Sequence, residues 1–256
     1  MGATPLAVEL EKDGALLRLR LSRPKANIVD AAMIAALRSA LDLHLPGTRL
    51  RGVLLTAEGP HFSFGASVEE HLPGSFAAML RELHALVLQL VASPVPVLVA
   101  VRGQCLGGGL EVAAAGHLIF AAPGAMFGQP EIKLAVFAPA ASCLLPERIG
   151  PSRAEDLLFS GRSIGAEEAH RIGLVHALAD DPGVAALAYF EEHLASLSAS
   201  SLRFAVRAAR YDLVYRIRRK LAEVERLYIE ELMATHDAVE GLTAFIAKRP
   251  PVWEDR

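Results

Sequence analysis

Hydrophobic and polar residues alternate in two short segments near the start of the chain, 6–11 and 16–21. In the second segment three leucines fall on one face and two arginines on the other, the pattern of a half-buried strand. The sequence Lys-Asp-Gly between the segments is a turn signal. The pattern therefore predicts a β-hairpin over residues 6–21.

Helical spacing of apolar residues follows, first after Asp30, a residue type that caps helices, and again over residues 75–92. The runs at 52–59 and 118–122 predict strands, and the apolar run at 96–101 is typical of a buried strand. A strand or strand pair followed by a helix thus recurs roughly every 40 to 50 residues, and such units must stack to bury their apolar faces. The pattern predicts an α/β fold.

The strands are expected to end at about Val175, and from Pro182 onward almost every segment has helical periodicity. This change predicts a boundary near residue 195, with a core over 1–195 and a helical region over 196–256. A long helix over 212–233 carries an apolar stripe. On the sequence alone, that stripe covers either its own domain or a neighbouring subunit.

Residues 101–116 carry the strongest chemical signal. A buried strand runs into three glycines and then into an alanine-rich helix that contains one carboxylate, Glu111. Glycines let a ligand approach the backbone closely, and the free amides at a helix start carry partial positive charge. The segment is either an anion or oxyanion site or only a tight turn. Glu111 is costly to bury among apolar neighbours, so it is paired, solvated by a cleft, or functional.

A second acid, Glu131, comes directly after Pro130, which can begin a helical turn. Alone it fits an ordinary first-turn glutamate, but with Glu111 it forms a candidate pair. Mutual repulsion and burial would leave one acid protonated and the other able to accept a proton, so the pair could add or remove water. In the loop 62–67, Gly65 permits a turn that leaves the Ala66 amide free.

Composition narrows the possible partners. The chain has 256 residues, of which 52% are hydrophobic, and a formal charge of −3, so no overall basic field attracts nucleic acid or an anionic membrane. Its longest apolar stretch, 86–101, is interrupted and too short to span a bilayer. The N-terminus lacks the features of a secretion signal. Neither the two cysteines, Cys105 and Cys143, nor any pair of histidines has the spacing of metal ligands. Cysteines that serve only in packing are typical of a protein in the reducing cytoplasm. We expect a cytoplasmic protein without a metal site.

These segments together resemble the crotonase superfamily, also called the enoyl-CoA hydratase/isomerase family. The similarity covers nearly the whole chain through SRPKAN, FSFGAS, VRGQCLGGGLE, FGQPEIKL, ERIG, GRSIGAEEAHRIGLV and AFIAKRPPVW. It implies a crotonase-like fold of stacked ββα units over 1–195, followed by a helical trimerisation region over 196–256. It also implies a homotrimer or a dimer of trimers.

The resemblance assigns roles to individual residues. The amides of Ala66 and Gly108 would hold the thioester carbonyl of an acyl-CoA. Glu111 and Glu131 would be the two carboxyl groups that add water, one as the acid and the other as the base, and the resemblance leaves open which is which. CoA would be part of the substrate, and no other cofactor is expected. The expected CoA- and substrate-binding residues are Lys25, Ala26, Ser63, Phe64, Ser67, Gly107, Val136, Phe137 and, from a neighbouring subunit, Lys248.

Three departures from the commoner family pattern concern the acyl pocket. Gly65-Ala66-Ser67 stands where Gly-Ala-Asp is usual, residues 25–30 read KANIVD, and VFAPAASCLLP replaces a glycine-rich run after Glu131. These differences resemble the subgroup that hydrates cyclohexa-1,5-diene-1-carbonyl-CoA. The expected reaction is a 1,4-addition that gives 6-hydroxycyclohex-1-ene-1-carbonyl-CoA, with Phe64, Val136, Phe137 and the 70–84 segment placing the ring. The alternatives are a general enoyl-CoA hydratase and a non-catalytic acyl-CoA- or RNA-binding member of the fold.

Overall fold

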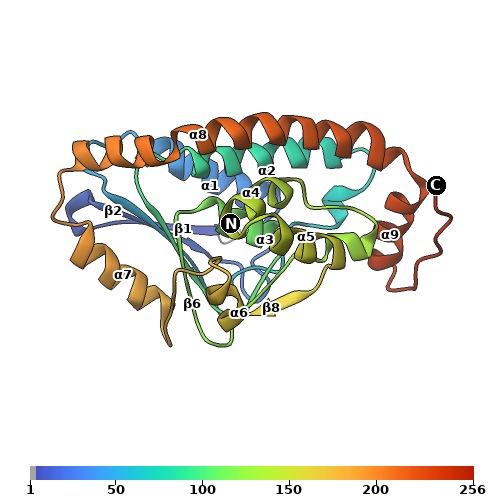
Figure 1. Cartoon of the computed structure of the whole chain (residues 1–256), viewed down its shortest axis with the longest axis horizontal. Helices are drawn as coiled ribbons and strands as arrows, with labels where there is room; N and C mark the ends of the chain where they lie inside the picture. Colours follow the sequence, from blue (N-terminus) through green and yellow to red (C-terminus); the bar gives the residue numbers. More distant parts are fainter. Residues whose placement is uncertain (1–3) are drawn as a thin grey trace.

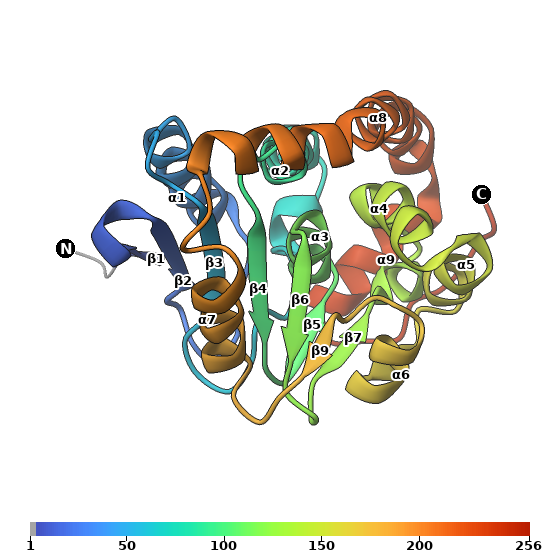
Figure 2. The same ribbon diagram turned by 60° about the vertical axis from the view of Figure 1, so that its left-hand side comes forward.

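The computed structural model describes residues 4–256, and a six-stranded sheet in the order β1-β2-β3-β4-β6-β9 lies at its centre (Figures 1 and 2). Its strands are β1 Leu6–Glu11, β2 Leu16–Leu21, β3 Gly52–Ala57, β4 Val97–Val101, β6 Leu118–Ala121 and β9 Ala177–Leu178. β1 and β2 pair antiparallel, and every other neighbouring pair is parallel. The predicted hairpin and the three predicted strands that follow it are confirmed.

A three-stranded sheet, in the order β5-β7-β8, lies beside the large one. Its strands are β5 Gln104–Leu106, β7 Met126–Gly128 and β8 Ser163–Gly165. Each of the first two directly follows a strand of the large sheet, β5 after β4 and β7 after β6, and a helix comes next in the chain. The units that begin with β4 and β6 therefore place one strand in each sheet before the helix. This agrees with the stacked ββα units that the family resemblance implies.

Helices cover both faces of the large sheet. The α-helices are α1 Ala31–His44, α2 Phe76–Val91, α3 Gly108–Ala115, α4 Pro139–Ile149, α5 Pro151–Ser160, α6 Ala166–Arg171, α7 Pro182–His193, α8 Ala199–Arg226 and α9 His236–Ile246. α7 packs on one face, against β3, β4 and β6, while α1, α2 and α3 belong to the larger core on the other (Figure 2). With both faces covered, all five residues of β4 are buried.

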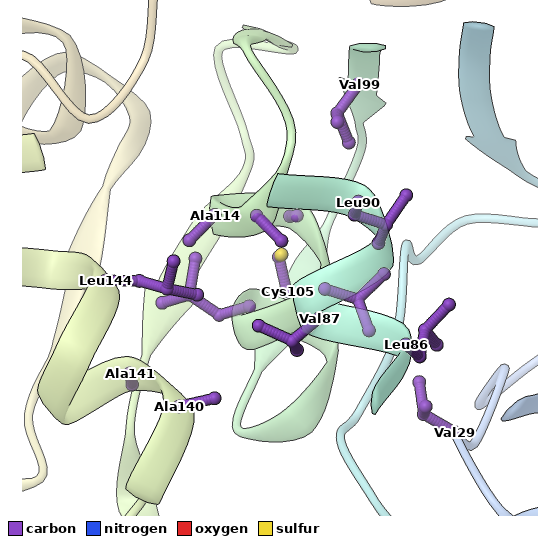
Figure 3. Close-up of a cluster of buried hydrophobic side chains, with 14 of the residues drawn as sticks. Val29, Leu86, Val87, Leu90, Val99, Cys105, Ala114, Ala140, Ala141 and Leu144 are labelled. Atoms are coloured by element: carbon purple, nitrogen blue, oxygen red, sulfur yellow. The ribbon is translucent and has the colours of Figure 1, made fainter. Parts of the chain in front are cut away.

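The first two predicted helices, α1 and α2, are present, and the apolar face that the spacing predicts for each is buried. The Asp30 side chain accepts a hydrogen bond from the Met33 amide at 2.9 Å, which caps α1 as expected. In α2, the apolar face that the spacing predicts is buried against the core. Both cysteines are free and buried. Cys105 packs among side chains of α2 and α3 (Figure 3), and Cys143 belongs to the same core cluster. Both cysteines are therefore packing residues, as predicted.

The C-terminal half differs from the prediction in two places. A two-residue strand, β9, follows Val175, and its pairing with β6 extends the sheet by one strand. α8 begins at Ala199 rather than near 212, because Ser198 caps it and strong helix formers fill its first turns. The predicted division at residue 195 falls in the connection between α7 and α8.

The apolar stripe of α8 covers the chain's own core. Ile217 and Leu221 are buried in the main core cluster, and so is Tyr228 in the π-helical turn Leu227–Glu231 that follows. The helix runs along α2 in Figure 1 and contacts both α2 and α4. The sequence left open whether this stripe covers its own domain or a neighbouring subunit. The structure supports the first interpretation, because the stripe packs on the core of the same chain.

Between residues 4 and 256, no helix combines the length and the hydropathy needed to cross a bilayer.

Candidate active site

Two glycine turns bring the loop after β3 against the start of α3. Gly65 has φ +112° and Gly107 has φ +50°, both outside the range that other residues adopt easily. A Cβ placed on Gly108 would lie 3.1 Å from the amide nitrogen of Ala66. Within residues 4–256, neither the Ala66 nor the Gly108 amide has a hydrogen-bond acceptor. Two neighbouring amides are therefore free to bind an oxyanion, the arrangement expected for these two residues.

Hydrogen bonds inside the protein hold this loop in place. The Val29 amide donates to the Gly65 carbonyl at 2.9 Å, and the Phe64 amide donates to the Ala26 carbonyl at 2.9 Å. The Gly65 amide donates to Ser63 Oγ at 3.1 Å. Ser63 is buried, so its side chain supports the turn that exposes the free amide.

Glu111 lies one turn into α3 and faces α4. It is 3% exposed, and its Oε1 accepts a hydrogen bond from the Ala141 amide at 2.8 Å. Burial raises the pKa of the Glu111 carboxyl, while the amides of Ala141 and Ala140 and the nearby His84 oppose that rise. The protein thus desolvates this carboxylate but compensates it with donors and a neighbouring imidazole.

Glu131 lies in the 3₁₀ turn Pro130–Leu134, opposite the glycine turn. A Cβ on Gly107 would come within 2.6 Å of its Oε1, so this approach requires glycine. With its amide nitrogen turned toward the acid, Gln129 donates to both carboxyl oxygens, at 3.0 and 3.1 Å. Burial, with a contribution from the Glu111 charge, raises the pKa of Glu131 to about 8. A carboxyl group with a pKa this far above its ordinary value keeps its proton at neutral pH.

The two acids and the two free amides line one narrow pocket of about 80 Å³. Most of its wall is apolar, which excludes water from the charged groups and strengthens their interactions. Its lining residues are Phe64, Gly65, Ala66, Val68, His71, Leu80, Leu83, Gly107, Gly108, Glu111, Pro130, Glu131, Leu134, Val136, Phe137, Ala138, Pro139 and Leu242. The structure thus brings together both predicted acids, both predicted amides and four predicted substrate-binding residues.

The remaining predicted binding residues lie outside this pocket. Lys25 is exposed, and the Ser67 hydroxyl donates to Glu69 at 3.1 Å. Lys248 is exposed just after α9, the helix that contacts the turn carrying Glu131 in the same chain.

Three neighbours of the site lacked a signal in the sequence. Leu242 of α9 completes the pocket wall, although it lies far along the chain from both acids. Tyr228, predicted only as part of an apolar stripe, packs edge to face on Phe137 with ring centroids 5.2 Å apart. His84 acts electrostatically on Glu111 from α2, a helix recognised only by its apolar face. Only the folded arrangement brings these residues to the site.

Comparison with known proteins agrees with this geometry. The family described as "Enoyl-CoA hydratase/isomerase" matches residues 11–256. The cyclohexa-1,5-dienecarbonyl-CoA hydratase of Thauera aromatica is 70% identical over 254 residues, which cover 99% of this chain and 98% of that protein. A probable enoyl-CoA hydratase of Mycobacterium tuberculosis is 33% identical, over 96% of this chain and 97% of its own length.

Solved structures give the same result. The crystal structure of an enoyl-CoA hydratase from Mycobacterium avium subsp. paratuberculosis K-10 superposes with a TM-score of 0.86 at 25% identity, over 99% of this chain and all of that one. An enoyl-CoA hydratase/isomerase from Pseudoalteromonas atlantica T6c gives 0.83 at 28% identity, over 97% and 99% of the two chains. The fold is therefore crotonase-like. The chain belongs to the enoyl-CoA hydratase/isomerase family.

Proposed function

We propose that the protein is a hydro-lyase that adds water to cyclohexa-1,5-diene-1-carbonyl-CoA in the anaerobic degradation of aromatic compounds. The product is 6-hydroxycyclohex-1-ene-1-carbonyl-CoA. The observation that carries the substrate is the 70% identity, over nearly the full length of both chains, to a relative that is named for this activity. The glutamate pair beside two free amides supports the reaction type.

The unequal environments of the two acids support a division of roles. Glu111, with the Ala141 amide on one oxygen, is the base that takes a proton from water as the water attacks the β-carbon. The negative charge spreads through a dienolate, whose thioester oxygen binds the amides of Ala66 and Gly108. Glu131, which holds its proton to about pH 8 because burial raises its pKa, protonates the far end of the diene. Water's hydroxyl and one proton are thereby added across four carbons.

The apolar wall supports a cyclic acyl group. Phe64, Val136 and Phe137 line the pocket beside the two acids, with Leu80 and Leu83 of α2 on the wall as well. An apolar ring fits such a wall without leaving a polar group unpaired, and the wall would fix which carbon faces Glu131.

The CoA part of the substrate is assigned by family resemblance. We propose that the backbone near Lys25, Ala26, Ser63 and Ser67 holds its nucleotide and that Lys248 of a neighbouring subunit approaches its phosphates. The glutamate pair and the two free amides supply the base, the acid and the oxyanion site that the addition of water needs, so we propose that the reaction needs no further cofactor or metal. We also propose a cytoplasmic location and no nucleic-acid or membrane partner, in keeping with the formal charge of −3.

We further propose that the protein is a homotrimer or a dimer of trimers. In support, three aromatic residues of α8, namely Phe204, Tyr211 and Tyr215, are between 65% and 73% exposed. They line a groove of about 970 Å³ between α8 and the end of α2, away from the glutamates. A large exposed apolar surface of this kind is typical of a protein interface.

A second candidate is a general short-chain enoyl-CoA hydratase. Relatives between 31% and 34% identical, named as probable enoyl-CoA hydratases, favour it. The test compares kcat/KM for cyclohexa-1,5-diene-1-carbonyl-CoA and crotonyl-CoA, following the gain of one water by mass spectrometry. Preference for the cyclic substrate supports the proposal. Preference for crotonyl-CoA favours the second candidate, and no hydration of either would overturn both.

A further inference from the structure

One histidine of the pocket wall takes no part in the proposed proton transfers. His71 ends the 3₁₀ turn Glu69–His71, is half-buried, and lines the same pocket as Glu111 and Glu131. Most of that wall is apolar, and a polar ring in such a place costs free energy unless its nitrogen atoms find partners. The partners of the two ring nitrogens therefore show what the ring can do.

The turn itself provides a partner for the first nitrogen. Nδ1 of His71 lies 2.7 Å from the carbonyl oxygen of Ser67. A carbonyl oxygen only accepts, so Nδ1 carries the proton and donates it. The turn is held in turn by the His71 amide, which donates to the Val68 carbonyl at 3.1 Å, and by the Glu70 carboxylate, which accepts from the Ala31 amide at 3.1 Å. The orientation of the ring is thus fixed by backbone contacts.

The second nitrogen is an unused acceptor. Burial lowers the pKa of His71, and the hydrogen bond to Ser67 only partly offsets this effect, so the ring is neutral at neutral pH. A neutral imidazole that carries its proton on Nδ1 has a lone pair on Nε2 and can only accept there. Among residues 4–256, Nε2 of His71 has no hydrogen-bond donor. The pocket that contains both glutamates therefore offers one free acceptor.

The proposed reaction brings a matching donor. The diene ring and its thioester group contain no N–H or O–H, so the donors at the acyl end are the attacking water and, after addition, the new hydroxyl group. Water has two O–H bonds, and Glu111 as the base accepts one of them. In a mostly apolar pocket, an O–H without an acceptor is costly. Glu131 is directed at the far carbon, and both its oxygens already accept from Gln129.

We propose that His71 orients the attacking water: its Nε2 accepts the second O–H of that water and, after addition, the hydroxyl group of the product. This inference rests on the proposed hydratase function. The first proton of the water goes to Glu111 as the oxygen bonds to the β-carbon, and Glu131 gives its proton to the far carbon. The second O–H stays intact and becomes the product hydroxyl, so His71 neither gains nor loses a proton.

Three substitutions separate the acceptor from the fold of the turn. His71→Leu removes both ring nitrogens and should lower kcat for hydration of the diene about 30-fold, with KM changed less than twofold, because the diene has no hydroxyl. His71→Asn can keep the hydrogen bond to Ser67 but has no acceptor at the Nε2 position, and should lose as much activity. His71→Gln reaches that position with a carbonyl oxygen and should stay within about fivefold of wild type.

The matched control is an exposed histidine on the other face of the sheet. His193 is exposed and lies in α7, the helix that covers the face opposite the pocket helices. His193→Leu makes the same change of side chain as His71→Leu. It should leave kcat and KM unchanged.

A binding experiment tests the contact without turnover. In the Glu131→Gln background, which leaves the thioester unconverted, calorimetry compares 6-hydroxycyclohex-1-ene-1-carbonyl-CoA with cyclohexanecarbonyl-CoA, which has no hydroxyl group. Adding His71→Leu should weaken binding of the hydroxylated thioester about tenfold and that of the other less than twofold. Retained binding of the second thioester also shows that the pocket is folded.

Two results would overturn the inference. If His71→Asn keeps wild-type kcat, the ring only holds the turn through Ser67. If His71→Leu weakens binding of both thioesters equally, Nε2 does not contact the hydroxyl group. Failure of the proposed function is a different result, because the wild-type protein would then hydrate neither the cyclic diene nor crotonyl-CoA.

Discussion

Replacing Glu131 by glutamine should abolish hydration and at the same time stabilise the protein at alkaline pH. Glutamine keeps the shape of the side chain and cannot ionise. Burial raises the pKa of Glu131 from its ordinary value of 4.5 to about 8. The folded protein therefore holds a proton that the unfolded chain has released between these two pH values, and the free energy of unfolding falls as the pH rises through this window.

The size of the effect follows from that shift. Between pH 5.5 and 8.5, linkage predicts a loss of about 3 kcal/mol in the wild-type protein that the variant does not suffer. For a chain of this length, this corresponds to a change in Tm of about 9 °C. Below about pH 4 the two proteins should respond to pH alike, because Glu131 then holds its proton in the folded state and mostly holds it in the unfolded chain as well.

The assay is thermal unfolding of wild type, Glu131→Gln and Glu155→Gln across pH 5 to 9, with hydration measured on the same samples. Glu155 is an exposed glutamate and controls for loss of one surface charge. We expect the Tm gap to open only for Glu131→Gln, with CoA-ester binding retained and hydration lost. Parallel Tm curves for all three proteins would refute the claim that a buried, protonated acid lies at this position.

The remaining predictions concern pH, the amides and the ring. The kcat of the wild type should fall above about pH 8, because the pKa of Glu131 is about 8 and the acid must hold its proton; a rate that still rises at pH 9 contradicts this role. Gly108→Ala places a methyl group 3.1 Å from the Ala66 nitrogen and should lower kcat about 100-fold, whereas Gly124→Ala, with open space around it, should not. Phe137→Ala should lower the preference for the cyclic over the linear thioester about tenfold in kcat/KM, and an unchanged ratio would remove Phe137 from ring placement.

Local patterns account for most of the fold. Alternation predicts the hairpin, helical spacing predicts α1 and α2, and the residue that caps α1 is found where its type indicates. The missed parts have different causes. β9 is two residues long and exists because β6 offers it an edge. The first turns of α8 carry a local signal, the cap Ser198 and the helically spaced residues Leu202 and Val206, but the prediction began the helix only near residue 212.

The site shows the same division between local and tertiary information. Gly107, Gly108 and Glu111 share one motif, so their proximity could be predicted from the sequence. Unequal pKa values could be expected of a carboxylate pair, but their order could not be predicted. The groups that oppose the effect of burial on Glu111, the amide of Ala141 and the ring of His84, come from other helices.

The most direct test of the account is hydration of cyclohexa-1,5-diene-1-carbonyl-CoA in deuterium oxide, with the product examined by NMR. The proposed 1,4-addition predicts a hydroxyl group on the β-carbon and a single deuterium on the carbon at the far end of the diene, delivered by Glu131. Deuterium on the carbon next to the thioester would contradict the proposed 1,4-addition, and an unreacted substrate would contradict the hydratase itself.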